Sequence, residues 1–266
     1  MTSQAPPDLL ATIVAATRRI VAVRSTEVPL KALERALSRR PDGDAFRRAL
    51  SESPTPRIIA ECKRRSPSRG ILRQHYDAAA HARAYQDAGA AAVSVLTEPT
   101  FFDGDPSHLR AVRNAVTIPV LRKDFIVSGY QLYEAAAIGA DAVLLIVGAL
   151  NDHELRDLHH KAGTLGLECL VEVHDVAELA RALDAGASIV GVNSRNLRTM
   201  SVDLKVLDTI GGLLPPDVIA VAESGIRTRD DIDRLTEAGY GAFLVGERLI
   251  GQPDPGEALR QLNGHP

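Results

Sequence analysis

An α/β fold in which eight βα units close into a single barrel is predicted by three observations on this 266-residue chain. From residue 57 onward, short apolar runs alternate with longer polar segments of helical period, which is typical of parallel sheets. Glycine recurs at the end of every second helical segment, at positions 89, 139, 186 and 239, with spacings of 50, 47 and 53 residues. Residues 57–266 allow about 26 residues for each of eight units, the size usual in a (β/α)8, or TIM, barrel.

Each apolar run has the length of one buried strand, and a plausible helix follows each of the first seven. Residues 255–263 can supply the eighth helix. An open doubly wound sheet is the alternative, but it normally carries a glycine-rich phosphate turn after its first strand, where this chain has KRRSPSRG. We therefore predict barrel strands within residues 57–63, 91–97, 118–124, 141–147, 167–173, 188–193, 218–223 and 241–246.

The first 56 residues have a different pattern and precede the barrel as a helical extension of the same domain. Apolar residues follow one helical stripe over residues 9–23. A second helical stretch contains Leu30, Leu33 and Leu37 and later Phe46 and Leu50, and prolines 54 and 56 end it. The domain prediction is thus one domain over residues 1–266, with an extension at 1–56 and eight βα units at 57–266.

Composition excludes several classes of protein. Forty-five per cent hydrophobic residues can bury enough apolar surface to argue against intrinsic disorder. A net charge of −3 argues against a nucleic-acid partner, and the short basic segment 63–70 has no aromatic residue on which a base could stack. The longest clean apolar stretch, 142–147, is too short to cross a membrane, and the N-terminus lacks the features of a secretory signal. We expect a cytoplasmic protein.

The sequence shows no pattern for a metal or a nucleotide cofactor. No Cys/His spacing suits zinc, and there is neither a GxxxxGK[ST] loop nor a GxGxxG turn after a strand. Cys62 and Cys169 both lie in apolar runs, where reduced, buried and unreactive thiols are expected. We predict a protein without metal or cofactor.

Charged and amide side chains stand where five of the predicted strands end, and the C-terminal ends of the strands are where barrel enzymes have their active sites. Glu61 and Lys63 are two residues apart and therefore face the same way, whereas Cys62 between them faces the opposite way. Neighbouring lysines and glutamates favour each other's charged forms, and such a group suits proton transfer on a carbonyl or a carbon acid. The residues in question are Glu61, Lys63, Lys123, Glu172, Asn193 and Glu223.

Two further features predict a small anionic substrate. The turns after the last two strands contain Ser224, Gly225 and Gly246, and in barrels these loops commonly offer backbone N–H groups and a helix N-terminus to a phosphate. The helix after residue 226 shows a capping-box pattern, Thr228 with Asp231. The basic segment 63–70, expected to be a flexible loop, would form an electropositive lip. Three phenylalanines near strand ends, at 101, 102 and 125, could wall a flat apolar group.

Six of these segments, taken together and in this order, resemble the indole-3-glycerol phosphate synthase family of tryptophan biosynthesis over essentially the full chain. They are AECKRRSPSRG, LRKDF, LVEVH, GVNSRNLRT, AESGI and FLVGE. The resemblance implies a carboxy-lyase that closes the ring of 1-(2-carboxyphenylamino)-1-deoxyribulose 5-phosphate and releases CO2 and water. It also implies that the N-terminal extension covers the C-terminal face of the barrel and that no cofactor takes part.

By position in these motifs, the resemblance assigns a role to each candidate residue. Lys123 matches the general acid of ring closure, and Lys63 matches the lysine that holds the substrate carboxylate and serves as an acid in dehydration. Glu172 matches the later general base, and Glu61 the glutamate that orients the lysines. Asn193 and Glu223 match residues that position hydroxyl groups, and Arg195 belongs to the same substrate site. Binding of the phosphate is assigned to Ser66, Ser224, Gly225 and Gly246, and binding of the aromatic ring is assigned to Phe125.

Some questions stay open at this stage. Glu247 directly follows Gly246, and because a carboxylate repels a phosphate, either Glu247 points away or the grip on the phosphate is weaker. A phosphoribosylanthranilate isomerase is one alternative, although that family has a catalytic cysteine where the first strand ends and an aspartate on the sixth. A non-catalytic sensor of a phosphate ligand is another, but no catalytic charge is missing. We expect a monomer or a weak homodimer acting on a small molecule that carries a carboxylate and a phosphate ester.

Overall fold

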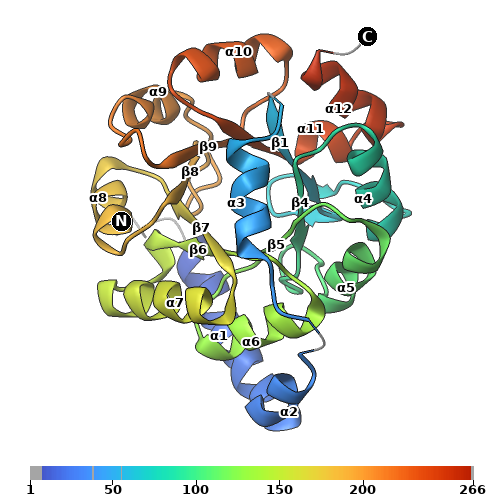
Figure 1. The fold of residues 1–266 in the computed structure, drawn as a ribbon, viewed down its shortest axis with the longest axis vertical. Helices are drawn as coiled ribbons and strands as arrows, with labels where there is room; N and C mark the ends of the chain where they lie inside the picture. The colour runs from blue at the N-terminus through green and yellow to red at the C-terminus, as the bar shows by residue number, and fades with distance from the viewer. Residues whose placement is uncertain (1–7, 38, 55, 265–266) are drawn as a thin grey trace, which may run out of the picture.

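The computed structural model describes residues 8–264, except residues 38 and 55. Eight parallel strands close into a barrel in the order β1-β10-β9-β8-β7-β6-β5-β4, and the last of these pairs with β1 (Figure 1). The predicted (β/α)8 barrel is therefore confirmed, and every barrel strand lies inside its predicted run. The strands are β1 (Arg57–Cys62), β4 (Ala92–Leu96), β5 (Val120–Lys123), β6 (Ala142–Ile146), β7 (Glu168–Val173), β8 (Ile189–Asn193), β9 (Ile219–Glu223) and β10 (Ala242–Val245).

Helices surround the barrel, and most begin at a residue whose side chain caps the first turn. Asp77, Asp105 and Ser128, for example, each accept a hydrogen bond from a backbone N–H two or three residues further on. The helices of the barrel are α4 (Ala78–Asp87), α5 (Pro106–Ala115), α6 (Gly129–Ile138), the 3-10 turn η1 (Val147–Ala149), α7 (Asp152–Leu165), α8 (Val176–Asp184), α9 (Lys205–Gly211), α10 (Arg229–Glu237), α11 (Glu247–Ile250) and α12 (Pro255–Asn263).

Side chains on each strand alternate between two apolar layers, as the period of a strand requires. On β1, Ile58, Ala60 and Cys62 pack against the surrounding helices, whereas Ile59 points into the barrel. The barrel interior is filled by apolar residues up to the C-terminal ends of the strands, where Glu61 and the other charged residues replace them. Alternation therefore turns the polar strand-end residues into the barrel, and the parallel direction of the strands places them at one end, above the apolar interior residues.

The N-terminal extension contains three described helices, not the two predicted: α1 (Leu9–Glu27), α2 (Leu30–Arg35) and α3 (Gly43–Ser51). The predicted second helical stretch is interrupted because Pro41 disfavours helix in the residue before it and lacks an N–H of its own. Asp42 then caps α3 by accepting a hydrogen bond from the Ala45 N–H at 2.9 Å. Residues 1–7 of the predicted extension and residues 265–266 of the last unit lie outside the described residues.

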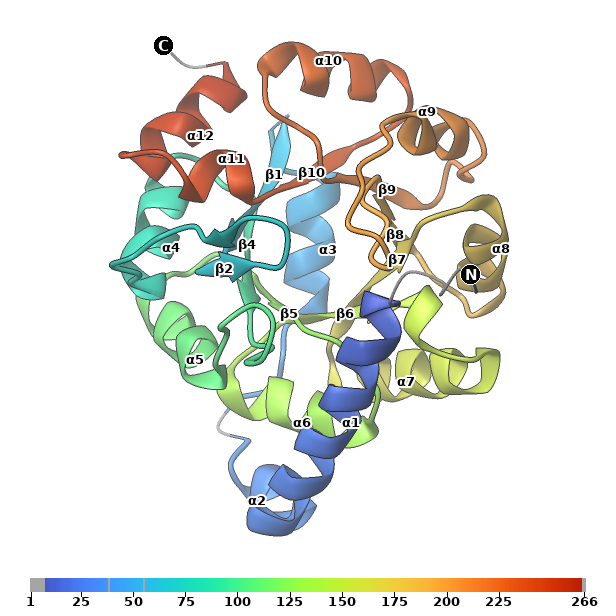
Figure 2. The ribbon, with the colours of Figure 1, turned by 180° about the vertical axis from the view of Figure 1, so that it is seen from behind.

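The first helix, α1, lies over the C-terminal side of the barrel, where the extension was expected (Figure 2). The Leu9 N–H donates to the Arg198 carbonyl at 3.3 Å, in the loop after β8. Arg18 pairs with Glu154 at 2.9 Å, and the Tyr130 hydroxyl donates to the Arg24 carbonyl at 3.2 Å. The predicted position of the extension thus holds for α1.

The third helix, α3, takes the opposite position and closes the N-terminal end of the barrel (Figure 1). Phe46 and Leu50 are buried in the same apolar cluster as the interior barrel residues. Arg47 forms an ion pair with Glu168, the first residue of β7, at 2.6 Å, and donates to the Ser188 hydroxyl at 2.6 Å. The extension therefore contacts both ends of the barrel: α1 covers the C-terminal side, and α3 closes the N-terminal end.

The basic segment after β1 is not the flexible loop that the sequence suggested. Residues Arg65–Ser66 (β2) and Gly70–Ile71 (β3) pair as an antiparallel hairpin, with Arg65 opposite Ile71 and Ser66 opposite Gly70. Gly70 has a φ of +69°, a left-handed conformation that costs glycine little, which lets the hairpin close in few residues. The electropositive segment is thereby given a defined shape at the barrel mouth.

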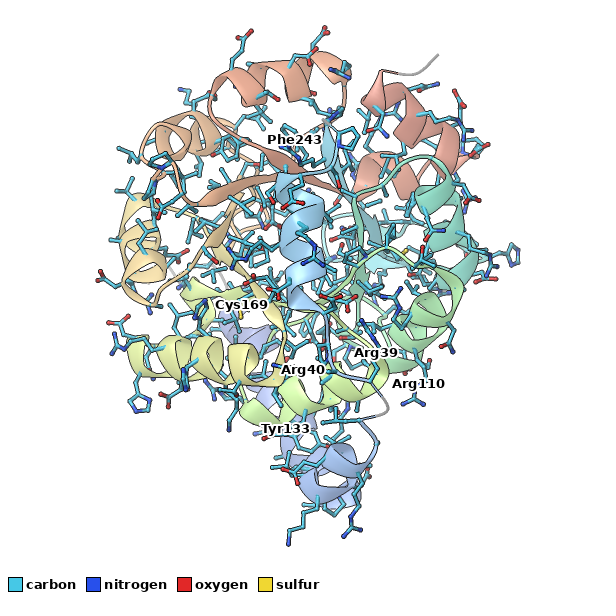
Figure 3. All side chains as sticks on the ribbon, viewed as in Figure 1. Arg39, Arg40, Arg110, Tyr133, Cys169 and Phe243 are labelled. Carbon is cyan, nitrogen blue, oxygen red and sulfur yellow. The ribbon has the colours of Figure 1, made fainter. Side chains whose placement is uncertain are left out.

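Both cysteines are free and buried, as predicted, with Cys169 lying in the layer between β7 and its helices (Figure 3). Burial raises the pKa of both thiols well above the ordinary value, and the nearby Glu61 and Glu168 carboxylates raise it further. Since the thiolate is the reactive form, these protonated thiols are unreactive. Among the described helices, none combines the length and the apolar character needed to span a membrane.

Candidate active site

A cavity of about 530 Å³ opens at the C-terminal ends of the barrel strands. Twelve of the candidate residues named from the sequence line it, although they come from six separate segments of the chain. Those residues are Glu61, Lys63, Ser66, Lys123, Phe125, Glu172, Asn193, Arg195, Glu223, Ser224, Gly225 and Gly246. The barrel topology therefore gathers the predicted set into one place.

Two lysines are held by carboxylates inside this cavity. Lys123, at the end of β5, lies 2.9 Å from Glu223 Oε2 and 3.2 Å from Glu172 Oε2. Lys63, just beyond β1, lies 2.5 Å from Glu61 Oε1, as the two-residue spacing predicted. All three carboxylates are nearly inaccessible to solvent, and each is paired with an ammonium group that offsets the cost of burying its charge.

Burial and charge act in opposite directions on the pKa values of this group. Burial lowers the pKa of Lys123, but Glu223, Glu172 and Glu61 outweigh it and raise the pKa above its usual range. For Glu172, burial raises the pKa, and Lys123 and His174 bring it well below its ordinary value. Burial and the neighbouring Glu172 raise the pKa of Glu223 to about 7, against the pull of Lys123. Two carboxylates on one ammonium thus have different affinities for a proton.

The turns after β9 and β10 also border the cavity. Ser224 and Gly225 both have positive φ, +66° and +77°, which is rare for serine. A Cβ on Gly246 would lie 2.2 Å from Glu61 Oε1, so only glycine lets the backbone approach the layer of charged residues so closely. These turns bring backbone and hydroxyl groups to the cavity wall, and buried Ser66 of the hairpin lies on the same cavity.

The starts of α10 and α11 differ in how their backbone N–H groups are capped. The predicted capping box is present: Thr228 Oγ1 accepts from the Asp231 N–H at 3.2 Å, and Asp231 accepts from the Thr228 N–H at 2.9 Å. Asp231 also accepts from the Arg227 N–H at 2.9 Å, so the first turn of α10 is occupied by its own chain. In contrast, α11 begins at Gly246 without a side-chain cap.

The side chain of Glu247 lies at the edge of the cavity, next to the turn after β10, and does not point away from the cavity. Its carboxylate lies 3.2 Å from Arg195 Nη2 and 3.2 Å from Arg69 Nε. Ser68 donates to the same carboxylate at 3.5 Å. Glu247 therefore balances the charge of the two arginines at this edge of the cavity.

Apolar residues form the remaining wall. The rings of Phe102 and Phe125 lie with centroids 5.9 Å apart and planes tilted by 35°, above Leu144 and Ile146 of β6. Phe101, expected to join them, packs on the interior core and does not line the cavity. An aromatic ring of the substrate would fit against this wall, between the lysines and the apolar floor.

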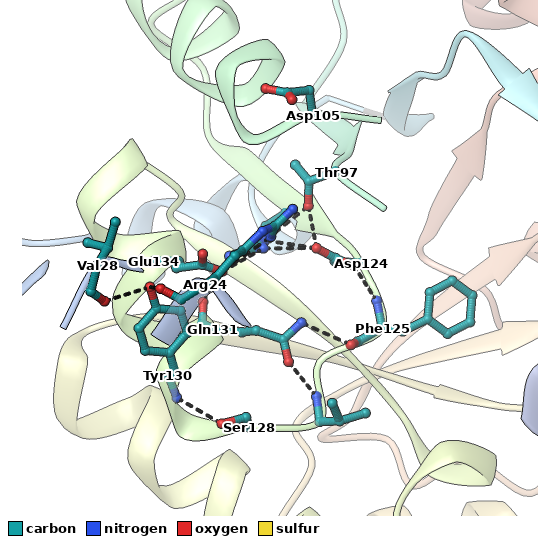
Figure 4. A network of polar contacts seen from close by, with 12 residues as sticks. Arg24, Val28, Thr97, Asp105, Asp124, Phe125, Ser128, Tyr130, Gln131 and Glu134 are labelled. Atoms are coloured by element: carbon teal, nitrogen blue, oxygen red, sulfur yellow. Dashed lines mark hydrogen bonds and ion pairs between the residues drawn. The ribbon is translucent and has the colours of Figure 1, made fainter. Parts of the chain in front are cut away.

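A buried polar network joins Thr97, Asp124 and Glu134 (Figure 4), and it includes both residues next to Lys123 in the chain. The guanidinium of Arg122, fully inaccessible to solvent, binds Asp124 Oδ2 at 2.9 Å and Glu134 Oε2 at 3.2 Å, and donates to Thr97 Oγ1 at 3.0 Å. Burial lowers the pKa of Arg122, but Asp124 and Glu134 raise it above its usual value. The network fixes the strand end that carries Lys123.

Among the residues that the structure describes, no group of three or more His, Cys, Asp or Glu side chains has the arrangement of a metal site. Sequence reasoning missed several residues of the cavity and its support. His174 contacts Glu172 from behind, and its place two residues after Glu172 was a usable signal, because such residues share a face. Leu197, Met200 and Val202 come from the long loop after β8, which carries no pattern that predicts its path.

Known structures with a similar fold include a thiamine phosphate pyrophosphorylase from Pyrococcus furiosus, with a TM-score of 0.61 at 18% identity. It matches over 78% of this chain and 94% of its own. The structure described as native KDPGal has a TM-score of 0.56 at 19% identity over 79% of this chain and 93% of its own. At this level of identity, these similarities support the barrel fold alone.

Similarity in sequence is much stronger. Residues 10–262 match the family model described as indole-3-glycerol phosphate synthase. A protein of that name from Parafrankia sp. (strain EAN1pec) is 49% identical over 96% of this chain and 95% of its own. Those from Koribacter versatilis (strain Ellin345) and Albidiferax ferrireducens are 47% and 45% identical, over 93% and 96% of this chain and 96% and 98% of their own. The chain therefore belongs to the indole-3-glycerol phosphate synthase family.

Proposed function

We propose that the cavity at the barrel mouth is where this carboxy-lyase of tryptophan biosynthesis converts 1-(2-carboxyphenylamino)-1-deoxyribulose 5-phosphate to indole-3-glycerol phosphate. The observation that carries the proposal is the pair of carboxylate-bound lysines between an apolar wall and the turns after β9 and β10. The substrate carries a carboxylate, a flat ring and a phosphate, and the cavity offers two lysines, an apolar wall and these turns as complementary groups.

In the proposed first step, the ring carbon that bears the carboxylate attacks the ribulose carbonyl. A C–C bond forms, and Lys123 gives a proton to the carbonyl oxygen as it becomes a hydroxyl. The raised pKa of Lys123 supports this role, because the side chain then carries its proton throughout the neutral range. Buried carboxylates nearby offset the positive charge that develops on the substrate nitrogen.

Decarboxylation and dehydration complete the reaction. The substrate carboxylate leaves as CO2, and its bonding electrons restore the aromatic ring. Glu172 then takes a proton from the carbon next to the nitrogen while the hydroxyl group departs as water, with Lys63 as its acid. Glu61 orients Lys63 at 2.5 Å, and Asn193 and Glu223 are placed to hold substrate hydroxyls.

The binding roles follow the same division of the cavity. We assign the phosphate to Ser66, Ser224, Gly225 and Gly246, with Arg195 at the rim, and the aromatic ring to Phe125. An isomerase using Cys62 is disfavoured, because that thiol faces the helical layer and donates to the Ala78 carbonyl at 3.7 Å.

We also propose that residues 1–266 act as one domain and that the chain works as a monomer. Helices α1 and α3 share the apolar cluster of the barrel interior, which supports one domain, and the cavity is lined by residues of a single chain. Two free, buried thiols support a reducing compartment such as the cytoplasm.

One assay tests the proposed reaction. The purified chain is mixed with the carboxyphenylamino substrate, and indole fluorescence is followed between pH 6 and 8.5. We expect turnover across this range, and its absence at every pH would contradict the proposal.

Replacing Glu172 by glutamine should lower kcat by two to three orders of magnitude (roughly 10²–10³-fold) while KM changes by about threefold or less. Glutamine keeps the size of the side chain but cannot accept the proton, so the loss falls on a step after binding. Steady-state kinetics with the same fluorescence readout measures both constants. Glu237→Gln, at an exposed position on α10, is the control and should leave both unchanged. A larger change in KM than in kcat would contradict the role as a base.

Replacing Glu247 by glutamine should lower KM by about threefold and leave kcat within about twofold, because the carboxylate no longer competes with the phosphate for Arg69 and Arg195. The gain should shrink at high salt, which screens charges at the rim. Kinetics at low and high salt provide the test. Glu257→Gln, which removes the surface partner of Arg260 on α12, is the control. A rise in KM would show that Glu247 orders the arginines for the phosphate instead.

A further inference from the structure

His174 joins the proposed general base to a second carboxylate that lies outside the cavity. Its ring nitrogens lie 3.3 Å from Glu172 Oε1 and 3.0 Å from Glu178 Oε2. The side chain of His174 is 14% exposed and does not line the cavity. Glu172 Oε1 and His174 Nε2 are buried within ion-pair distance of each other, and among the described residues neither atom has a hydrogen-bond partner. A line of carboxylate, imidazole and carboxylate thus runs from the barrel mouth to α8.

The far end of this line is fixed by the backbone. Glu178 Oε2 accepts from the His174 backbone N–H at 2.8 Å as well as facing the ring, so one carboxylate holds both parts of the residue. Gly148 of η1 leaves room for it, since a Cβ there would come within 2.8 Å of Glu178 Oε1 and 3.4 Å of Leu10 in α1. The cluster is therefore enclosed by β7, α8, η1 and the N-terminal helix.

The near end controls how Glu172 meets the substrate. Oε2 of Glu172 faces Lys123, while Oε1 faces His174, so the carboxylate is held between two cations. When Lys123 turns to the substrate carbonyl, His174 is the cation that still holds the carboxylate. Burial lowers the pKa of His174, but Glu172 and Glu178 raise it to about 10, which keeps the ring charged at neutral pH.

We propose that His174, clamped by Glu178, is a positioning residue for the reaction: it fixes Oε1 of Glu172 and keeps Oε2 turned toward the substrate. This inference rests on the proposed function of Glu172. The charged and titratable groups around the ring are Glu172 on β7 and Glu178 on α8, with Lys123 and Glu223 beyond Glu172.

The test compares His174→Gln with the wild-type chain in the fluorescence assay between pH 3 and 9, because the lowered pKa of Glu172 places its acidic limb below pH 5 in the wild type. We expect kcat to fall by about 10-fold to 100-fold, as for other residues that orient an active group, with KM nearly unchanged. Without the cation, the carboxylate of Glu172 holds its proton more strongly, so the acidic limb of the kcat profile should move to higher pH by about one unit. A merely structural role would leave that limb in place.

Two further variants sharpen the comparison. Glu178→Gln keeps an acceptor for the backbone N–H of His174 but removes the second negative charge. We expect it to shift the acidic limb of the kcat profile in the same direction by a smaller amount. If His174→Gln does not fold, the Glu178→Gln variant provides the test. His153→Gln is the matched control, because His153 faces Asp157 in the same i,i+4 arrangement at 3.1 Å but is 80% exposed on α7. It should leave kcat and its pH profile unchanged.

A second readout separates failure of this inference from failure of the proposed function. In the resting protein, NMR of the imidazole signals should show His174 protonated throughout the neutral range. If the wild type turns over substrate but folded His174→Gln and Glu178→Gln match it in kcat and profile, the inference is wrong. If the wild type is inactive, the proposed function is wrong, and a His174 ring that titrates near 6.5 would then overturn the clamp itself.

Discussion

Replacing Lys123 by methionine should lower kcat by three to four orders of magnitude (roughly 10³–10⁴-fold) without unfolding the barrel. Methionine retains the apolar stem but removes the proposed acid and the cation that two buried carboxylates share at 2.9 and 3.2 Å. Substrate binding should survive in large part, because Lys63 and the turns after β9 and β10 are untouched. Indole fluorescence measures the rate, and circular dichroism checks the fold.

The same change should alter the acid–base behaviour of the site. Without Lys123, Glu172 and Glu223 face each other inside a buried pocket, so one of them should take up a proton at neutral pH. Lys205→Met, at an exposed position on α9, controls for the loss of a positive charge and should be as active as the wild type. Normal kcat in Lys123→Met would contradict the role as general acid.

Replacing Arg122 by methionine should cost about 3–5 kcal/mol of the free energy of unfolding, the range for a broken buried ion pair. The guanidinium is fully buried and pairs with Asp124 at 2.9 Å and Glu134 at 3.2 Å (Figure 4). Its loss leaves the buried Asp124 carboxylate without this cation and leaves Glu134 with only Arg24, at 3.7 Å. A fall in Tm of roughly 10 °C is expected for a domain of this size. Thermal denaturation followed by circular dichroism provides the measurement.

Arg110→Met is the control for this variant, because Arg110 lies at the outer surface on α5 (Figure 3). It should leave Tm within about 1 °C. Equal stability of Arg122→Met and the wild type at neutral pH would show that the network is dispensable.

Much of this molecule could be predicted from the chain alone, because its signals are local and repeat. The eight apolar runs and the glycines that end alternate helices predict the barrel, and each observed strand falls inside its predicted range. The polar residues that follow the strands were predicted to meet, because parallel strands place their C-terminal ends at one face. The two-residue spacing of Glu61 and Lys63 predicted their contact, observed at 2.5 Å.

Other features depend on contacts between distant segments. Helix α3 closes the N-terminal end of the barrel, and β2 and β3 pair as a hairpin. Nothing in the sequence of these segments predicts the segments that they contact. Glu247 faces Arg195 and Arg69, which settles on which side of the rim its charge lies. These outcomes follow from where the loops run, and local patterns carry no information about that path.

The barrel, the end at which the site lies and the residues that face into it could all be predicted from the chain, because strand period and strand direction are properties of short segments. The pairing of charged groups could be read only from the folded molecule: Lys123 with Glu172 and Glu223, His174 with Glu172 and Glu178, and Arg122 with Asp124 and Glu134. Pairing across the barrel depends on strand register and on how far each side chain reaches. It is these pairings that set the charge of each group and, with it, the proposed chemistry.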